Sequence, residues 1–110
     1  MIFDKEGNTT IVFQENISLN TFLVNLNNAY DKIKHDHIVV NLFSFEKLSS
    51  NDVLEFLDLS NKHRGARKSF VLVTDKVNYD DAPEEICLVP TIQEAKDIIE
   101  MEEIERDLEI

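Results

Sequence analysis

The chain has 110 residues, of which 43% are hydrophobic and 30% charged, a composition typical of one folded globular domain over residues 1–110. Its formal net charge of −11 at pH 7 argues against binding to a nucleic-acid backbone or an anionic membrane surface, since both need a surplus of lysine and arginine. We therefore expect its partners to be other proteins.

The first third of the chain predicts a β-hairpin followed by a helix. Residues 1–4 and 9–14 are short apolar runs, and Gly7 and Asn8 between them tolerate the positive φ angles of a tight turn. Ser18 is expected to begin the helix, because apolar residues then recur at the three- and four-residue spacing of one helical face. These residues are Phe22, Leu23, Leu26, Tyr30 and Ile33.

Two interior strands with a helix between them are predicted next. Ile38–Phe43 and Phe70–Val73 are nearly continuous in apolar residues, as expected of strands that are covered on both faces. Between them, a helix is expected from about residue 51 to residue 63, ended by Gly65. Its inward stripe consists of Val53, Phe56, Leu57 and Ser60.

The last third predicts a loop, a strand and a long helix. Residues 75–85 are polar and indicate a loop with at most one helical turn, and residues 85–89 form the last strand. Thr91 and Glu94 match a capping box at the start of the final helix. The apolar face of this helix holds Ile92, Ala95, Ile98, Ile99, Met101, Ile104 and Leu108.

The element order is therefore β-β-α-β-α-β-β-α. It predicts an α/β fold in which an N-terminal β-hairpin opens a mixed, mostly parallel sheet, with about three helices packed against it.

A serine pair lies at the predicted start of the second helix. Ser49 and Asp52 match a capping box, in which a side-chain oxygen accepts a hydrogen bond from a free backbone N–H group. A phosphate on Ser49 or Ser50 would meet the same donors and the positive end of the helix dipole, although the carboxylate of Asp52 would repel it. The pair is thus either a plain helix cap or a regulatory phosphorylation site.

Five features of the chain together resemble a STAS domain. They are the hairpin, the strand at residues 38–43, the serine turn with its helix, the strand at 69–75 and the ending Val89-Pro90-Thr91-Ile92-Gln93-Glu94-Ala95. This is the fold of anti-sigma-factor antagonists and of the cytoplasmic tails of sulfate transporters. The resemblance covers nearly the whole chain and implies a non-catalytic regulatory protein of a bacterial cytoplasm. Its expected partner is another protein, such as an anti-sigma factor or a kinase-like regulator.

The signature of that family is an Asp-Ser-Ser-Gly turn whose first serine is phosphorylated by a partner kinase. Alignment on the apolar Leu48 makes Ser50 the phosphoacceptor, whereas pairing the two serine dipeptides makes it Ser49. In both alignments, the family's aspartate and glycine are replaced by other residues. The resemblance also implies a partner-docking surface at the start of the helix, formed by Asn51, Asp52, Val53, Glu55 and Phe56.

Metal, cofactor and catalytic sites are not expected. His35-Asp36-His37 is the only cluster that resembles a metal site. A zinc site needs three or four ligands, and the only other histidine or cysteine residues are His63 and Cys87. We interpret the cluster as a polar connection between a helix and a strand. Asp75 follows a strand without a glycine-rich phosphate loop and is interpreted as a turn residue.

The cysteine count and the N-terminal sequence predict a cytoplasmic location. The lone Cys87 cannot form an internal disulfide, which suits a reducing compartment. The N-terminal residues also lack the basic and apolar regions of a secretory signal, so none is expected.

Two charged segments leave an alternative function open. Lys62–Lys68 is a basic segment at a predicted helix end, where it complements the helix dipole or engages an acidic partner, including the acidic residues 100–109 of another copy. If Met101, Ile104 and Leu108 extend beyond the core, they form an apolar stripe rimmed by acids. The alternative is then a structural or scaffolding subunit, for example a homodimer, that self-associates through its acidic C-terminal helix. A further alternative, also implied by the family resemblance, is a domain that senses a nucleotide or a lipid.

Overall fold

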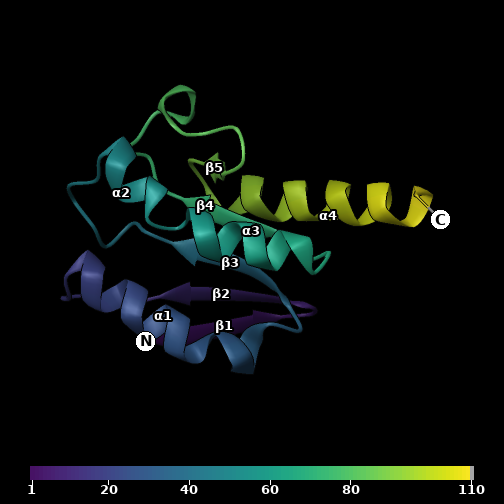
Figure 1. Cartoon of the computed structure of the whole chain (residues 1–110), viewed down its shortest axis with the longest axis horizontal. Helices are drawn as coiled ribbons and strands as arrows, with labels where there is room; N and C mark the ends of the chain where they lie inside the picture. The colour runs from purple at the N-terminus through teal and green to yellow at the C-terminus, as the bar shows by residue number, and fades with distance from the viewer. Residues whose placement is uncertain (110) are drawn as a thin grey trace.

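The computed structural model describes residues 1–109 and contains one five-stranded sheet. The strands lie side by side in the order β1-β2-β3-β4-β5, which is also their order along the chain. The first two are antiparallel and the others run parallel to their neighbours, so the predicted α/β fold with a hairpin and a mostly parallel sheet is confirmed (Figure 1). The strands are β1 (Ile2–Glu6), β2 (Thr9–Phe13), β3 (His37–Asn41), β4 (Phe70–Val73) and β5 (Cys87–Val89).

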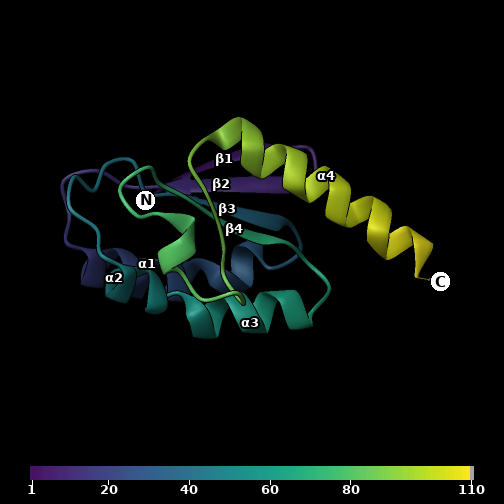
Figure 2. The same ribbon diagram turned by 90° about the horizontal axis from the view of Figure 1, so that it is seen from above.

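Helices cover both faces of this sheet. One face carries α1 (Leu19–Ile33), α2 (Ser50–Leu54) and α3 (Leu57–Gly65), and the other carries α4 (Ile92–Leu108) alone (Figure 2). A parallel sheet that grows in one direction through right-handed crossovers places its connections on one face. Only the helix that follows the last strand is therefore available to cover the other face. The β4–β5 connection contains a single 3₁₀ turn at Tyr79–Asp81, as predicted.

The two layers enclose two separate apolar cores. In the interior strands, successive side chains alternate between them, so Ile38 and Val40 face α1 and α3 while Val39 faces α4. This alternation explains why these strands are apolar at nearly every position. The larger core includes Phe22, Leu26, Val53, Phe56, Phe70 and Leu72, and the smaller one Ile11, Val39, Val71, Val73, Val89, Ala95 and Ile99.

The second predicted helix is divided in two, which corrects the expected single helix over residues 51–63. The N–H groups of Glu55 and Phe56 bond to carbonyls three residues back, Asp52 at 3.2 Å and Val53 at 3.1 Å, so the turn tightens and α2 ends. No glycine or proline marks this break, and Val53 and Phe56 are both fully buried across it.

The end of α3 also differs from the expectation. Gly65 is the last residue of α3, but the left-handed conformation that reverses the chain belongs to Arg67, whose φ is 64°. At the hairpin, by contrast, Gly7 takes a positive φ of 60°, as the turn requires. No helix within residues 1–109 combines the length and the apolarity needed to cross a bilayer.

Candidate functional site

The serine turn lies at the carboxyl end of the parallel strands. The chain leaves β3 at Asn41, passes through an exposed loop and enters α2 at Ser50 (Figure 1). The loop that follows β4 at residue 74 and the one that follows β5 at residue 90 begin at the same edge of the sheet. This edge is where open α/β sheets commonly place binding sites, because several loops converge there.

The predicted capping box at the start of α2 is confirmed by its geometry. The Ser49 hydroxyl oxygen accepts a hydrogen bond from the Asp52 N–H at 3.2 Å, and the Asp52 carboxylate accepts one from the Ser49 N–H at 2.9 Å. Ser49 is exposed, whereas Ser50, the first residue of the helix, is half-buried. Both candidate phosphoacceptors are therefore at the helix N-terminus, and Ser49 is the more accessible one.

Two lysines line a shallow depression beside this cap. The depression has a volume of about 370 Å³ and is also lined by Ser49 and Asp52. Lys47 comes from the loop before α2, and Lys76 from the loop after β4. Glu46 also lines the depression, and Lys76 lies 3.8 Å from the Asp75 carboxylate. A phosphate on Ser49 would thus meet two lysines that the linear sequence does not place together, opposed by the carboxylates of Glu46 and Asp52.

The predicted docking surface is only partly at the surface. Asn51 and Glu55 are exposed and Asp52 is half-buried, so these three can meet a partner. Val53 and Phe56 are fully buried in the larger core, which corrects their assignment to the docking surface. Their apolar side chains hold α2 and α3 against the sheet instead.

Two exposed apolar side chains in this part of the chain were not predicted. Phe43, just past the end of β3, is 42% exposed, and Leu54, at the end of α2, is 44% exposed. Large apolar side chains are less often left at the surface than polar ones, and they are enriched at the centres of protein interfaces. The sequence predicts Phe43 at the end of a buried strand, but β3 already ends at Asn41, which corrects that expectation.

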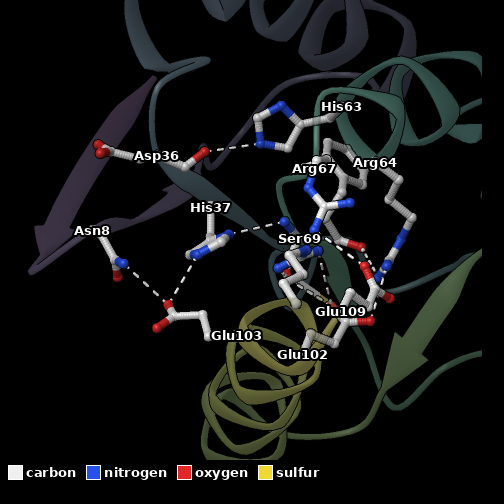
Figure 3. A network of polar contacts seen from close by, with 12 residues as sticks. Asn8, Asp36, His37, His63, Arg64, Arg67, Ser69, Glu102, Glu103 and Glu109 are labelled. Atoms are coloured by element: carbon white, nitrogen blue, oxygen red, sulfur yellow. Dashed lines mark hydrogen bonds and ion pairs between the residues drawn. The ribbon is translucent and has the colours of Figure 1, made fainter.

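A second polar cluster, here called the amino-end network, lies at the opposite edge of the sheet, where the parallel strands begin (Figure 3). It consists of Asn8, Asp36, His37, His63, Arg64, Arg67, Ser69, Glu102, Glu103, Arg106 and Glu109. At the start of β3, His37 Nδ1 accepts a hydrogen bond from the Ser69 N–H at 2.9 Å, and its Nε2 lies 2.9 Å from the Glu103 carboxylate. A backbone N–H can only donate, so Nδ1 carries no proton and Nε2–H donates to Glu103. His37 is thus held as one neutral tautomer.

His63 is fixed in the same way. Its Nε2 lies 2.8 Å from the Asp36 carbonyl oxygen, which can only accept, and its Nδ1 lies 2.7 Å from the Tyr30 hydroxyl. The tautomer is therefore Nε2–H, and the Tyr30 hydroxyl donates to Nδ1. Burial lowers the pKa of His63 to about 4, although the bond to Asp36 partly opposes this shift. Burial likewise lowers the pKa of His37, against the opposing effect of Glu103.

Two arginines of the basic segment, for which either a helix-end role or an acidic partner was expected, pair with acids of their own chain. Arg64 contacts the Glu102 carboxylate at 2.9 Å, and Arg67 contacts Glu109 at 3.1 Å (Figure 3). The Ser69 hydroxyl donates to Glu102 at 2.6 Å and accepts from Arg106 at 3.1 Å. These contacts join the end of α3 and the start of β4 to α4.

The pKa of Glu102 reflects this environment. Burial by itself would raise the pKa of this carboxyl, but the hydrogen bonds from Ser69 and Arg64 outweigh it, and the pKa is lowered. Asp36 behaves similarly, because its bonds with Thr10 and Lys5 outweigh the effect of burial and lower its pKa. The network thus favours charged carboxylates and neutral imidazoles.

The imidazole groups of the amino-end network are engaged in hydrogen bonds within the protein. Each imidazole nitrogen of His37 and His63 has a partner. Burial raises the pKa of the Cys87 thiol, which disfavours the nucleophilic thiolate. Within residues 1–109, no three His, Cys, Asp or Glu side chains group closely enough to hold a metal ion. The exposed residues of the serine turn remain the stronger candidate site.

Comparison with known proteins adds no assignment to this geometry. No protein-family model matches the chain, and no curated protein matches it at a significant level.

Proposed function

We propose that this protein is a non-catalytic regulatory domain that binds another protein through the carboxyl edge of its sheet, around the start of α2. The observation that carries the proposal is the exposed helix start itself, where Ser49, Asn51 and Glu55 stand at the surface at an edge where several loops converge. The neighbouring Phe43 and Leu54 add exposed apolar area of the kind that interfaces bury. The resemblance to anti-sigma-factor antagonists supports the same surface.

Site-specific photo-crosslinking in the native cell tests this docking surface. A photo-reactive amino acid at Asn51 or Glu55 is expected to capture the same partner polypeptide, because both side chains are exposed on α2. The matched control is Asp4, an exposed residue of β1 at the edge of the sheet. Equal capture from Asp4 or no discrete product from α2 would contradict the proposal.

Phosphorylation of Ser49 or Ser50 is the proposed switch of this surface. Lys47 and Lys76 support it because they line the adjacent depression and can pair with the phosphate, in competition with the Glu46 and Asp52 carboxylates that line it too. Intact-mass measurement of the protein from its native cell, followed by peptide mapping, is expected to find a partial phosphate that Ser49→Ala or Ser50→Ala removes. An unmodified mass under all growth conditions would retain the docking surface and reject the switch.

A second candidate function, a self-associating structural subunit, is favoured by one observation on α4. Met101, Ile104 and Leu108 are all exposed, although they are large and apolar. Light scattering over a range of protein concentrations tests it, with truncation after Ile99 as the comparison. A mass that rises with concentration only in the full chain would support self-association through this helix.

A further inference from the structure

The C-terminal half of α4 has its polar and apolar sides reversed relative to an ordinary surface helix. Its polar residues Glu102, Glu103 and Arg106 point into the protein and bind the amino-end network. Figures 1 and 2 show this half of the helix extending past the sheet. Within residues 1–109, the last α4 residue of the smaller apolar core is Ile99. Its apolar side chains face solvent instead: Met101 (59% exposed), Ile104 (55%) and Leu108 (80%).

These three side chains form one stripe, here called the α4 stripe. Their spacing of three and then four residues places them on the same side of the helix. The same spacing occurs along the seam of paired helices, where each apolar side chain packs between residues of the facing helix. The polar contacts on the inner side of α4 fix the rotation of the helix, so the stripe cannot turn inward without breaking them.

Unpaired acids border the α4 stripe. Glu100, Glu105 and Asp107 are exposed and form no ion pair within residues 1–109. The acids on the inner side of the helix, by contrast, are held by Arg64, Arg67 and other groups of the same chain. Free negative charge therefore gathers beside the exposed apolar surface.

We propose that the α4 stripe binds a basic amphipathic helix of another protein. Such a helix would bury Met101, Ile104 and Leu108 with its apolar face, and its lysine or arginine residues would oppose the acidic border. A second copy of this chain is a poorer fit, because pairing two α4 helices would bring acidic borders together and the two chains each carry a net charge of −11. The proposal does not depend on the docking surface at α2.

A designed peptide tests the proposal directly. The probe is a synthetic amphipathic helix of about 18 residues, with leucines at three- and four-residue spacing and lysines on both borders. Titrated into the isotope-labelled full chain, it is expected to bind saturably, to shift amide signals of α4, and to weaken as salt is added. A scrambled peptide of the same composition has no apolar face and is expected to bind at least about tenfold more weakly.

Variants of the full chain locate the binding. Ile104→Asp and Glu105→Lys are each expected to lower the affinity for the peptide about tenfold. The first removes apolar contact, and the second reverses the charge at the border. The matched control is Val24→Asp on α1, where Val24 is 58% exposed. Unchanged far-ultraviolet circular dichroism shows that each variant has folded.

Three outcomes would overturn the proposal. The first is equal binding of the scrambled peptide, which would show only a nonspecific attraction between opposite charges. The second is a loss of peptide affinity in the Val24→Asp control that equals the loss in Ile104→Asp. The third is a dimer in sedimentation that Ile104→Asp dissociates, because the second copy would then be what covers the α4 stripe.

Discussion

At the scale of single residues, the two buried histidines show how bonding geometry sets protonation. A proton added to His37 Nδ1 would face the Ser69 N–H, which cannot accept a hydrogen bond, and one added to His63 Nδ1 would make the Tyr30 hydroxyl an acceptor in place of a donor. Burial also disfavours the charged form of both rings. Both imidazoles are therefore expected to stay neutral well below the pH at which an exposed histidine is charged.

Histidine titration by nuclear magnetic resonance checks this expectation. The ring signals of His63 are expected to titrate with a pKa of about 4. Those of His37 are expected to titrate below the usual value, because of its burial. A pKa for His63 near the ordinary histidine value would contradict the burial of its imidazole.

Removal of the Tyr30 hydroxyl is expected to destabilise the protein. Tyr30→Phe leaves His63 Nδ1 without its donor in a buried place, which costs about 1 kcal/mol of the free energy of unfolding. The matched control is Tyr79→Phe, because Tyr79 is 68% exposed. Urea denaturation at neutral pH measures both, and equal effects of the two variants would argue against the buried bond.

Loss of the α2 cap is also expected to be measurable. Ser49→Ala removes the acceptor of the Asp52 N–H and is expected to lower the free energy of unfolding by about 1 kcal/mol. Ser50→Ala is the control, since Ser50 lies one residue past the cap, where alanine has a high helix propensity. Urea denaturation would count against the capping role if Ser50→Ala had the larger effect.

These residues also show what the sequence could predict. The Ser49–Asp52 cap was predictable because its partners are three residues apart. The bond between Tyr30 and His63, and the one between Ser69 and His37, join residues more than 30 positions apart. Such pairs depend on how the strands are ordered in the sheet, which local pattern does not specify.

At the scale of elements, strands and helix starts were predicted better than helix continuity and orientation. The apolar run of β4 and the caps of α1, α2 and α4 are local signals that were found where expected, whereas β3 spans His37–Asn41 in place of the expected residues 38–43. The break after Leu54 could not be predicted, because no glycine or proline marks it. In addition, Val53 and Phe56 on either side of it are both buried, which is compatible with one continuous helix. In α4, the apolar positions indicated one apolar face along the whole helix. In its second half, however, the polar contacts of Glu102 and Glu103 turn the polar side inward and leave Met101, Ile104 and Leu108 exposed.

The ion pairs between α3 and α4 are expected to hold that second half in place. Glu102→Ala leaves Arg64 and Ser69 without their shared acceptor and is expected to destabilise the protein by about 2 kcal/mol. Amide exchange in the last turns of α4 should accelerate more than in the sheet. Glu105→Ala on the outer side is the control, with an expected change within about 0.5 kcal/mol.

At the scale of the whole molecule, the amino-end network predicts loss of stability in acid. When folding lowers the pKa of a histidine, the free energy of unfolding is unaffected at pH values above the pKa of the unfolded state. Below that pH the unfolded chain takes up a proton before the folded protein does, so the free energy of unfolding falls. For His63, this window runs from about pH 6.5 down to about pH 4 and amounts to about 3 kcal/mol. The lowered pKa values of Glu102 and Asp36 extend the loss to lower pH.

A series of urea denaturation curves between neutral and acidic pH measures this dependence. The free energy of unfolding is expected to decline below about pH 6.5, with a slope that reports protons taken up on unfolding. A free energy that stayed constant over this range would show that the buried histidines do not gain protons on unfolding.

The single helix on the second face of the sheet has a consequence for synthesis of the chain. Ribosomes complete β1 to β5 before α4, so the growing chain can form the larger core while the other sheet face is still bare. Until α4 emerges, Ile11, Val39, Val71 and Val89 have no cover from the only helix that packs on them within residues 1–109. Nascent chains that end before residue 92 are therefore expected to bind chaperones or aggregate, whereas chains that include α4 have this face of the sheet covered.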